Sequence, residues 1–178
     1  CIKCKENSEL DMLFTLTTYT NPYLKLLLYN YKVLGTKSLS IHIASGLDYY
    51  IKTNNTLANC DIITSVPSHT NKIKSRGFDN MGIILNDLDK FVEHKNINGL
   101  IKTKDISQTS TKDRINREKQ SHDCYKLRSN NLYTNNKVVL VDDVFTTGTT
   151  LNACAKAIKY DKPKCVYGLI IAYNDSWN

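Results

Sequence analysis

VVLVDDVFTTGTTL, residues 138–151, runs from an uninterrupted apolar segment through two acids and a Thr/Gly loop to a helix start. A strand that is apolar on both faces is typical of the centre of a parallel sheet covered by helices. The carboxyl edge of such a sheet is where open α/β folds place their ligands. The stretch therefore predicts a central strand that ends at a ligand site.

Outward from this stretch, β-branched or apolar runs alternate with helical patterns along the chain. Apolar residues spaced by three and four positions predict helices after Asn21-Pro22 and over 37–53, 79–93 and 149–160. Strands are predicted at 12–19, 60–67 and 165–173, with a shorter one near 123–127, and 103–121 is interpreted as a long loop. This alternation predicts a single α/β domain with a central, mostly parallel sheet flanked by helices.

The composition is that of an ordinary globular protein, with 41% hydrophobic and 23% charged residues. No apolar run approaches the roughly 20 residues that a bilayer requires, and no secretory signal is recognisable, so we expect a cytoplasmic protein. The net charge of +7 comes mainly from scattered Lys. Arg is rarer, and Arg76 and the group Arg114, Arg117 and Arg128 are better candidates for anion contacts.

The six cysteines fall into two groups. Cys1 and Cys4 form a CxxC pair, the spacing with which two thiolates bind one Zn²⁺. Two further ligands are lacking, so the pair predicts an incomplete structural zinc site. The other four cysteines are interpreted as free thiols of a reducing compartment: Cys60, Cys124, Cys154 and Cys165.

The loop after the central strand carries the groups that bind a phosphate monoester. Thr146, Thr147, Thr149 and Thr150 supply hydroxyls and closely spaced backbone N–H groups. Gly148 permits the positive-φ geometry that directs several amides into one concavity. The helix that follows adds the positive end of its dipole. No Lys follows Gly148, which excludes a Walker A nucleotide-binding loop.

Asp142 and Asp143 directly precede this loop. Two carboxylates beside a phosphate would repel it, unless hydroxyl donors or a cation offset their charge. The vicinal hydroxyls of a sugar, together with Mg²⁺, meet that need. The alternative is that one Asp caps a turn while the other is solvated.

Two further segments are basic. Residues 68–78 carry Lys72, Lys74 and Arg76 just past a strand end, where they could attract a diphosphate or form an ordinary solvated loop. His69 there could be a general base or a local hydrogen-bonding residue. Residues 103–119 make a long basic connection, either a lid over an anionic ligand or a mobile surface loop.

Residues 138–151 resemble the phosphoribosyl pyrophosphate (PRPP) binding motif of type I phosphoribosyltransferases. Over nearly its whole length the chain resembles the ComF family, phosphoribosyltransferase-like proteins linked to bacterial competence and DNA uptake. The resemblance rests on the PRPP loop and on four other features of the sequence: VPSH (66–69), RGFDN (76–80), Gln108-Thr109 with Arg114 and Arg117, and the CIKC start.

The resemblance implies a type I phosphoribosyltransferase-like fold with a flexible hood loop, and it assigns roles to single residues. Asp142 and Asp143 would be the catalytic acids that hold the ribose hydroxyls near Mg²⁺, and 146–150 would hold the 5′-phosphate. Pro67, Ser68 and His69, with Lys72 and Arg76, would bind pyrophosphate, and Gln108, Arg114 and Arg117 would belong to the hood. Residues 1–10 would be the remnant of an N-terminal zinc ribbon, and 11–178 the phosphoribosyltransferase-like domain.

The function implied is Mg²⁺-dependent displacement of pyrophosphate from PRPP by an unknown acceptor, in bacterial natural transformation. The alternative is a PRPP-sensing adaptor without catalysis that binds the DNA-uptake machinery or single-stranded DNA. A general nucleic-acid binder is disfavoured, because the sequence lacks the interleaved aromatic and basic residues of single-strand binders.

Overall fold

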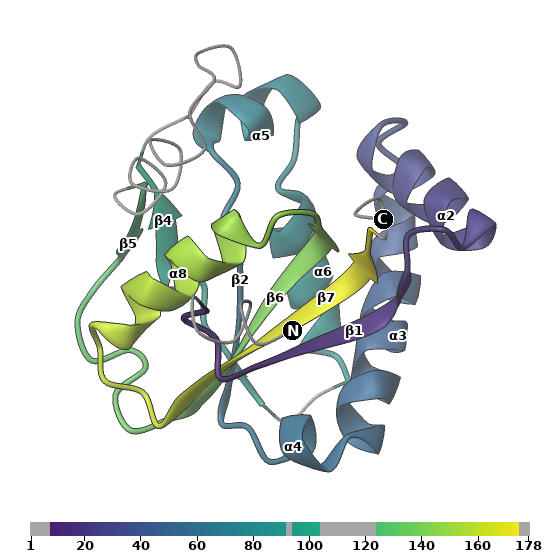
Figure 1. The fold of residues 1–178 in the computed structure, drawn as a ribbon. Coiled ribbons are helices and arrows are strands. Elements are labelled where there is room, and N and C mark those ends of the chain that lie inside the picture. The colour runs from purple at the N-terminus through teal and green to yellow at the C-terminus, as the bar shows by residue number, and fades with distance from the viewer. Residues whose placement is uncertain (1–7, 92–93, 104–123, 175–178) are drawn as a thin grey trace.

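The computed structural model describes residues 8–91, 94–103 and 124–174 (Figure 1). It confirms the predicted α/β class with a central parallel sheet. Five strands in the order β1-β7-β6-β2-β3 form this sheet, and every neighbouring pair is parallel. The strands are β1 (Met12–Thr18), β2 (Ile62–Ser65), β3 (Lys95–Asn96), β6 (Lys137–Phe145) and β7 (Cys165–Tyr173).

Helices cover both faces of the sheet, as its continuously apolar strands require. One face is covered by α2 (Pro22–Lys32), α3 (Ser40–Thr53) and α6 (Asn80–Leu88), and the other by α8 (Thr149–Lys159). Three short helical segments connect these elements: η1 (Lys37–Leu39), α4 (Asn55–Ala58) and α5 (Thr70–Arg76).

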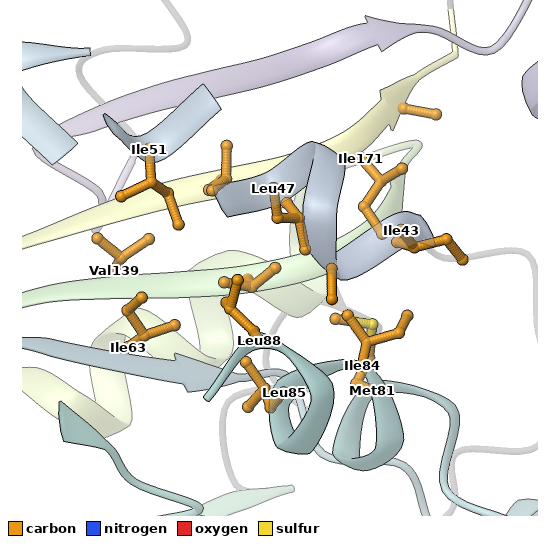
Figure 2. Packing of buried hydrophobic residues seen from close by; sticks show 14 of the residues in the cluster. Ile43, Leu47, Ile51, Ile63, Met81, Ile84, Leu85, Leu88, Val139 and Ile171 are labelled. Carbon is orange, nitrogen blue, oxygen red and sulfur yellow. The ribbon is translucent and has the colours of Figure 1, made fainter. Parts of the chain in front are cut away.

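The central strand β6 contributes to two separate cores. Val139 and Val141 belong to the core under α3 and α6, whereas Val138 and Leu140 belong to the core under α8. All four are fully buried, which is why this stretch of the sequence has no polar residue. Figure 2 shows the first of these cores, where side chains of α3 and α6 converge on the sheet around Ile63, Val139 and Ile171.

Local sequence signals explain several boundaries. The Asn21 side chain accepts hydrogen bonds from the N–H groups of Tyr23 and Leu24, and Pro22 occupies the first turn of α2, where its missing N–H costs little. The helix predicted over 37–53 begins with the 3-10 turn η1 before α3. The helix predicted over 79–93 ends earlier, at Leu88.

Besides α4 and β3, two further short elements were not recognised from the sequence. Residues 68–78, interpreted as a loop, contain α5, which ends at Gly77 in the left-handed conformation (φ 80°). β4 (Leu100–Lys102) pairs antiparallel with β5 (Tyr125–Leu127), where a short strand was predicted, and the two lie outside the main sheet. Both elements are too short to give a periodic pattern.

The remaining expectations concern the chain start, the thiols and the membrane. Residues 8–10 pack on α8, where the backbone N–H of Glu9 donates to Asn152 Oδ1 (3.0 Å). Cys60, Cys124 and Cys154 are buried free thiols and Cys165 is a half-buried one, as predicted.

None of the helices in the described ranges has the length and hydrophobicity of a membrane span.

Candidate functional site

A cleft of about 250 Å³ lies at the carboxyl ends of β2 and β6. Parallel strands bring their carboxyl ends to the same edge, so segments far apart in the sequence meet there. Residues from both predicted binding segments line this cleft, and they are Pro67, Ser68, His69, Lys72, Arg76, Asp142, Asp143 and Thr150. The structure therefore joins the acid pair, the end of the Thr/Gly loop and the basic segment into one site.

The Thr/Gly loop connects β6 to α8. Gly148 has φ 73° and ψ −5°, the left-handed geometry expected from the sequence, and it precedes the first residue of α8. Thr147 Oγ1 lies 3.0 Å from Thr149 Oγ1 across this turn. Of residues 146–150 only Thr150 is among those that line the cleft, and Thr146, Thr147 and Thr150 are all exposed. The positive end of α8 is thus directed to the cleft.

The two acids point to opposite faces of the sheet, because successive residues of a strand alternate. Asp142 continues the row of Val138 and Leu140 toward α8, and Asp143 continues the row of Val139 and Val141 toward α2 and α6. Both acids still line the cleft, since they lie at the end of the strand. The acid pair thus presents one carboxylate on each side of β6.

Asp143 forms an ion pair that the sequence did not reveal. Lys32 Nζ of α2 lies 2.6 Å from Asp143 Oδ2, and their side chains are 20% and 24% exposed. The two residues are far apart in the chain, so no local pattern connects them. This ion pair fixes one charge of the acid pair on the α2 side of the cleft.

Asp142 has a different environment. Burial, followed by the charge of Asp143, raises the pKa of Asp142 to about 7, although the Asp143 N–H donates to its Oδ1 (2.9 Å) and thereby favours the ionised form. Burial raises the pKa of the Cys154 thiol of α8, and the negative charge of Asp142 raises it further. A carboxyl group whose pKa is raised by burial and a like charge is typical of functional sites.

Asp142→Asn should stabilise the ligand-free protein, and the gain should be clearly larger at pH 8 than at pH 5. The folded protein keeps the Asp142 proton up to about pH 7, whereas the unfolded chain loses it near the ordinary value of 3.8. The folded state therefore binds more protons in this window, and the free energy of unfolding falls as pH rises through it. Asn does not titrate, so the free energy of unfolding of the variant does not fall in this pH range on account of residue 142.

We expect a gain on the order of 2 kcal/mol at pH 8, because a pKa shift is worth about 1.4 kcal/mol per unit and partial exposure weakens it. Urea unfolding at the two pH values, with a chelator present, measures the gain. An equal difference between variant and wild type at pH 5 and pH 8 would contradict the assignment.

The turn between β2 and α5 supplies the basic side of the cleft. His69 caps α5, and its Nδ1 accepts from the Asn71 N–H (3.2 Å), which is the local hydrogen-bonding role weighed for it. Lys72 and Arg76 extend from α5 to the cleft. Within the described residues neither cation forms an ion pair, so both are available to an anion.

β4 and β5 form the wall on the α8 side. Lys102 of β4 lies opposite Tyr125 of β5, with Lys102 Nζ 5.6 Å from the ring centre, and both line the cleft. Burial raises the pKa of Tyr125, and a hydrogen bond with Thr150 opposes that rise. The hydrogen bond between Tyr125 and Thr150 therefore connects β5 with the first turn of α8.

Some predicted site residues lie outside the described residues. These are the hood residues Gln108, Arg114 and Arg117, which fall between β4 and β5, and the predicted zinc ligands Cys1 and Cys4. Their roles stay predictions. Within the described ranges no group of three or more His, Cys, Asp or Glu residues could hold a metal ion.

The side of the cleft formed by α2 and α6 was missed almost entirely. Lys32, Asn80 and Met81 line it; none was assigned to the site from the sequence, and Asn80 entered only as the last residue of RGFDN (76–80). Asn80 gave one usable signal, because it precedes Ile84 and Leu88 at four-residue spacing on the apolar face of α6. A polar residue on a buried helix face needs a partner or a function.

Comparison with known proteins yields a family and a distant structural likeness. No curated protein matches the chain. Among solved structures, a chain titled as the allosteric regulatory enzyme of purine biosynthesis shares 16% identity with a TM-score of 0.49, over 74% of this chain and 25% of that one. This chain thus spans about a quarter of the length of that match.

The family model described as "Phosphoribosyl transferase domain" matches residues 73–176, which include α6, the acid pair and the Thr/Gly loop. Because this match covers more than half of the sequence, the chain belongs to the phosphoribosyl transferase domain family.

Proposed function

We propose that the cleft binds PRPP together with Mg²⁺ and transfers its phosphoribosyl group to an acceptor. The observation that carries the proposal is the meeting of Asp142, Asp143, Thr150 and the turn at 67–69 around one cleft. The 5′-phosphate would lie at the turn around Gly148 and at the N-terminus of α8. The ribose would lie over the acids at the end of β6.

The diphosphate of PRPP would lie against the turn between β2 and α5. Lys72 and Arg76 face the cleft there, and Lys102 adds a third cation from β4. The arrangement gives a multiply charged leaving group several donors. Arg76 is suited to bidentate contacts, and the two Lys act as point charges.

The residues present fit a magnesium ion that enters with the ligand. Mg²⁺ prefers oxygen ligands and is commonly held by one or two carboxylates plus substrate phosphates and water. Asp142 and Asp143 are the carboxylates at this cleft, and Asp143 also pairs with Lys32. When bound, the ion would neutralise the charge that develops on the leaving pyrophosphate.

In the proposed reaction the bond from ribose C1 to the diphosphate oxygen breaks, a bond from C1 to the acceptor forms, and the acceptor loses a proton. The protein mainly positions the two reactants. Asp142 and Asp143 would fix the ribose through its hydroxyls while Lys72 and Arg76 hold the diphosphate.

The ComF-like motifs extend the proposal to bacterial natural transformation and to a cytoplasmic location. VPSH (66–69) and RGFDN (76–80) both contribute to the cleft, through Val66, Pro67, Ser68 and His69 and through Arg76 and Asn80. The same pocket could instead serve a non-catalytic adaptor, in which bound PRPP alters contacts with the DNA-uptake machinery or single-stranded DNA.

Calorimetric titration with PRPP and Mg²⁺, followed by an assay for pyrophosphate release with a panel of acceptors, tests the proposal. Binding with release supports the transferase, and binding without release for any acceptor supports the adaptor. Absence of PRPP binding contradicts both. Salt-dependent binding of single-stranded DNA that responds to PRPP would specifically support the adaptor.

A further inference from the structure

Lys32 has no role in the PRPP assignment above, although it lines the cleft. The described residues that line the cleft include four Lys or Arg side chains. Lys72, Arg76 and Lys102 are assigned to the diphosphate, on the side of α5 and β4. Lys32 belongs to α2 and lies beside Asp143 instead. The cleft therefore holds one cation that the leaving group does not need.

The position of Lys32 in its helix is unusual for a lysine. It follows Leu28 by four residues, on the face of α2 that packs on the core, and its neighbour Tyr31 is fully buried. The Tyr31 hydroxyl donates to the carbonyl oxygen of Asn80 (2.6 Å), which fixes this end of α2 against α6. A lysine is rarely placed on such a face without a partner. The amine of Lys32 is thus carried on a rigid support at the edge of the cleft.

The partner of this amine is Asp143. Lys32 Nζ lies 2.6 Å from Asp143 Oδ2, and the two side chains are 20% and 24% exposed. In the described part of the chain the Asp143 carboxylate contacts no second hydrogen-bond donor or cation. A hydrogen bond between two charged groups is stronger than one between neutral groups. The orientation of Asp143 therefore depends on Lys32.

A fixed carboxylate is what a ribose diol needs from the protein. The sugar hydroxyls donate hydrogen bonds, and an ionised carboxylate is a strong acceptor for them. An acceptor that is already held in position loses little conformational entropy when the sugar arrives. Lys32 cannot serve a phosphate without giving up Asp143, because its charge is already paired. Lys32 therefore acts on PRPP through Asp143.

The same ion pair affects the binding of metal ions. Mg²⁺ and Mn²⁺ prefer oxygen ligands such as carboxylates, so two neighbouring acids would attract either ion in the absence of PRPP. Lys32 neutralises one of the two acids and occupies one of its oxygen atoms. The ligand-free cleft is therefore a poor site for a divalent ion that arrives without phosphates.

We propose that Lys32 is a positioning residue, which holds the Asp143 carboxylate for the ribose hydroxyls of PRPP and withholds it from a metal ion that arrives alone. This inference rests on the proposed binding of PRPP, and it gives a role to a residue of α2 that lies outside the motifs of the sequence. The division of roles leaves Asp142 as the carboxylate for an ion that enters with the diphosphate.

The test compares wild type with Lys32→Met, which keeps much of the length of the side chain and removes its charge. Affinities are measured at about 0.3 M salt, which screens the general effect of a lost charge. The variant should bind PRPP with Mg²⁺ at least about fivefold more weakly, because the acceptor is no longer held in place. Mn²⁺ without PRPP, followed by electron paramagnetic resonance, should bind at least about threefold more tightly, because a carboxylate is set free. A residue that only supported the fold would not strengthen metal binding when removed.

Two variants control for charge and for the loss of an ion pair. Lys32→Arg keeps a cation that can pair with a carboxylate, so both affinities should stay within about twofold of wild type. Lys52→Met breaks the Lys52–Asp48 pair of α3 (2.9 Å), away from the cleft, and should change neither affinity. The melting temperature checks that each variant is folded, and Lys32→Gln takes the place of Lys32→Met if the latter does not fold.

A double-mutant cycle with Asp143→Asn shows whether Lys32 acts through the carboxylate. In that background Lys32→Met should change either affinity by less than about twofold, because no carboxylate is left to hold. A loss of PRPP affinity that persists in full would mean that Lys32 contacts PRPP directly, and it would overturn the inference.

Two other results would overturn it as well. Lys32→Met could bind PRPP as tightly as wild type, or it could bind Mn²⁺ no more tightly than wild type. The failure of the proposed function looks different, because wild type itself would then not bind PRPP, and the inference would fall with it.

Discussion

The double variant Asp142→Asn/Asp143→Asn should bind PRPP with Mg²⁺ at least about 100-fold more weakly than wild type while keeping its fold. Hydrogen bonds to a charged group are each worth about 1.5–3 kcal/mol, and the variant weakens contacts from both carboxylates. The fold should survive because both acids lie in the half-buried carboxyl-terminal part of β6, beyond the fully buried residues 138–141. Titration calorimetry measures the affinity, and urea unfolding checks the fold.

Asp48→Asn provides the control for this variant. Asp48 pairs with Lys52 on α3, away from the cleft, and its side chain is 14% exposed, comparable with the 24% of Asp143. Removing its charge should leave PRPP affinity unchanged. Unaltered PRPP affinity in the double variant would mean that the acids do not hold the ribose.

Gly148→Ala should lower the free energy of unfolding by about 3 kcal/mol and largely abolish PRPP binding. The left-handed conformation at φ 73° strains any residue with a Cβ. A Cβ at this position would also lie 2.8 Å from Cζ of Phe145. The Phe145 ring cannot easily move away, since it stacks on Tyr173 with 5.6 Å between the ring centres.

Gly77→Ala separates the cost of the backbone strain from the cost of the contact with Phe145. Gly77 has a similar φ of 80°, but a Cβ there would meet nothing within 4 Å. That variant should therefore lose only about 1 kcal/mol, the cost of the backbone strain. Adding Phe145→Leu to Gly148→Ala should recover part of the larger loss. Equal losses for the two Gly variants would show that the contact with Phe145 does not matter.

The two Gly variants also indicate how the fold supports the site. Phe145 ends the central strand, Gly148 turns the chain, and α8 begins directly afterwards. The ring of Phe145 fills the space beside the Gly148 Cα, so the turn is fixed by packing as well as by its own geometry. A loop that is fixed before the ligand arrives loses less conformational entropy on binding.

The sequence by itself determined the fold class and the main segments that line the cleft. Residues 138–141 are apolar at every position because β6 is buried on both faces, which is a local property that a single stretch of sequence displays. Gly148 could be assigned its positive φ because only Gly adopts it without strain. Pro67, Ser68, His69, Lys72 and Arg76 could be placed together because they follow a strand end.

Only the tertiary structure decided which residues face one another across the cleft. The Lys32–Asp143 pair and the contact from Tyr31 to Asn80 join segments that are far apart in the chain. Whether such residues meet depends on how α2 and α6 pack on the sheet, and packing is a property of the whole core. The sequence therefore predicted the side of the cleft that the acid pair, Thr150 and the turn at 67–69 form. The α2–α6 side, with its paired Lys and an Asn80 amide that has no partner among the described residues, came from the packing of distant helices.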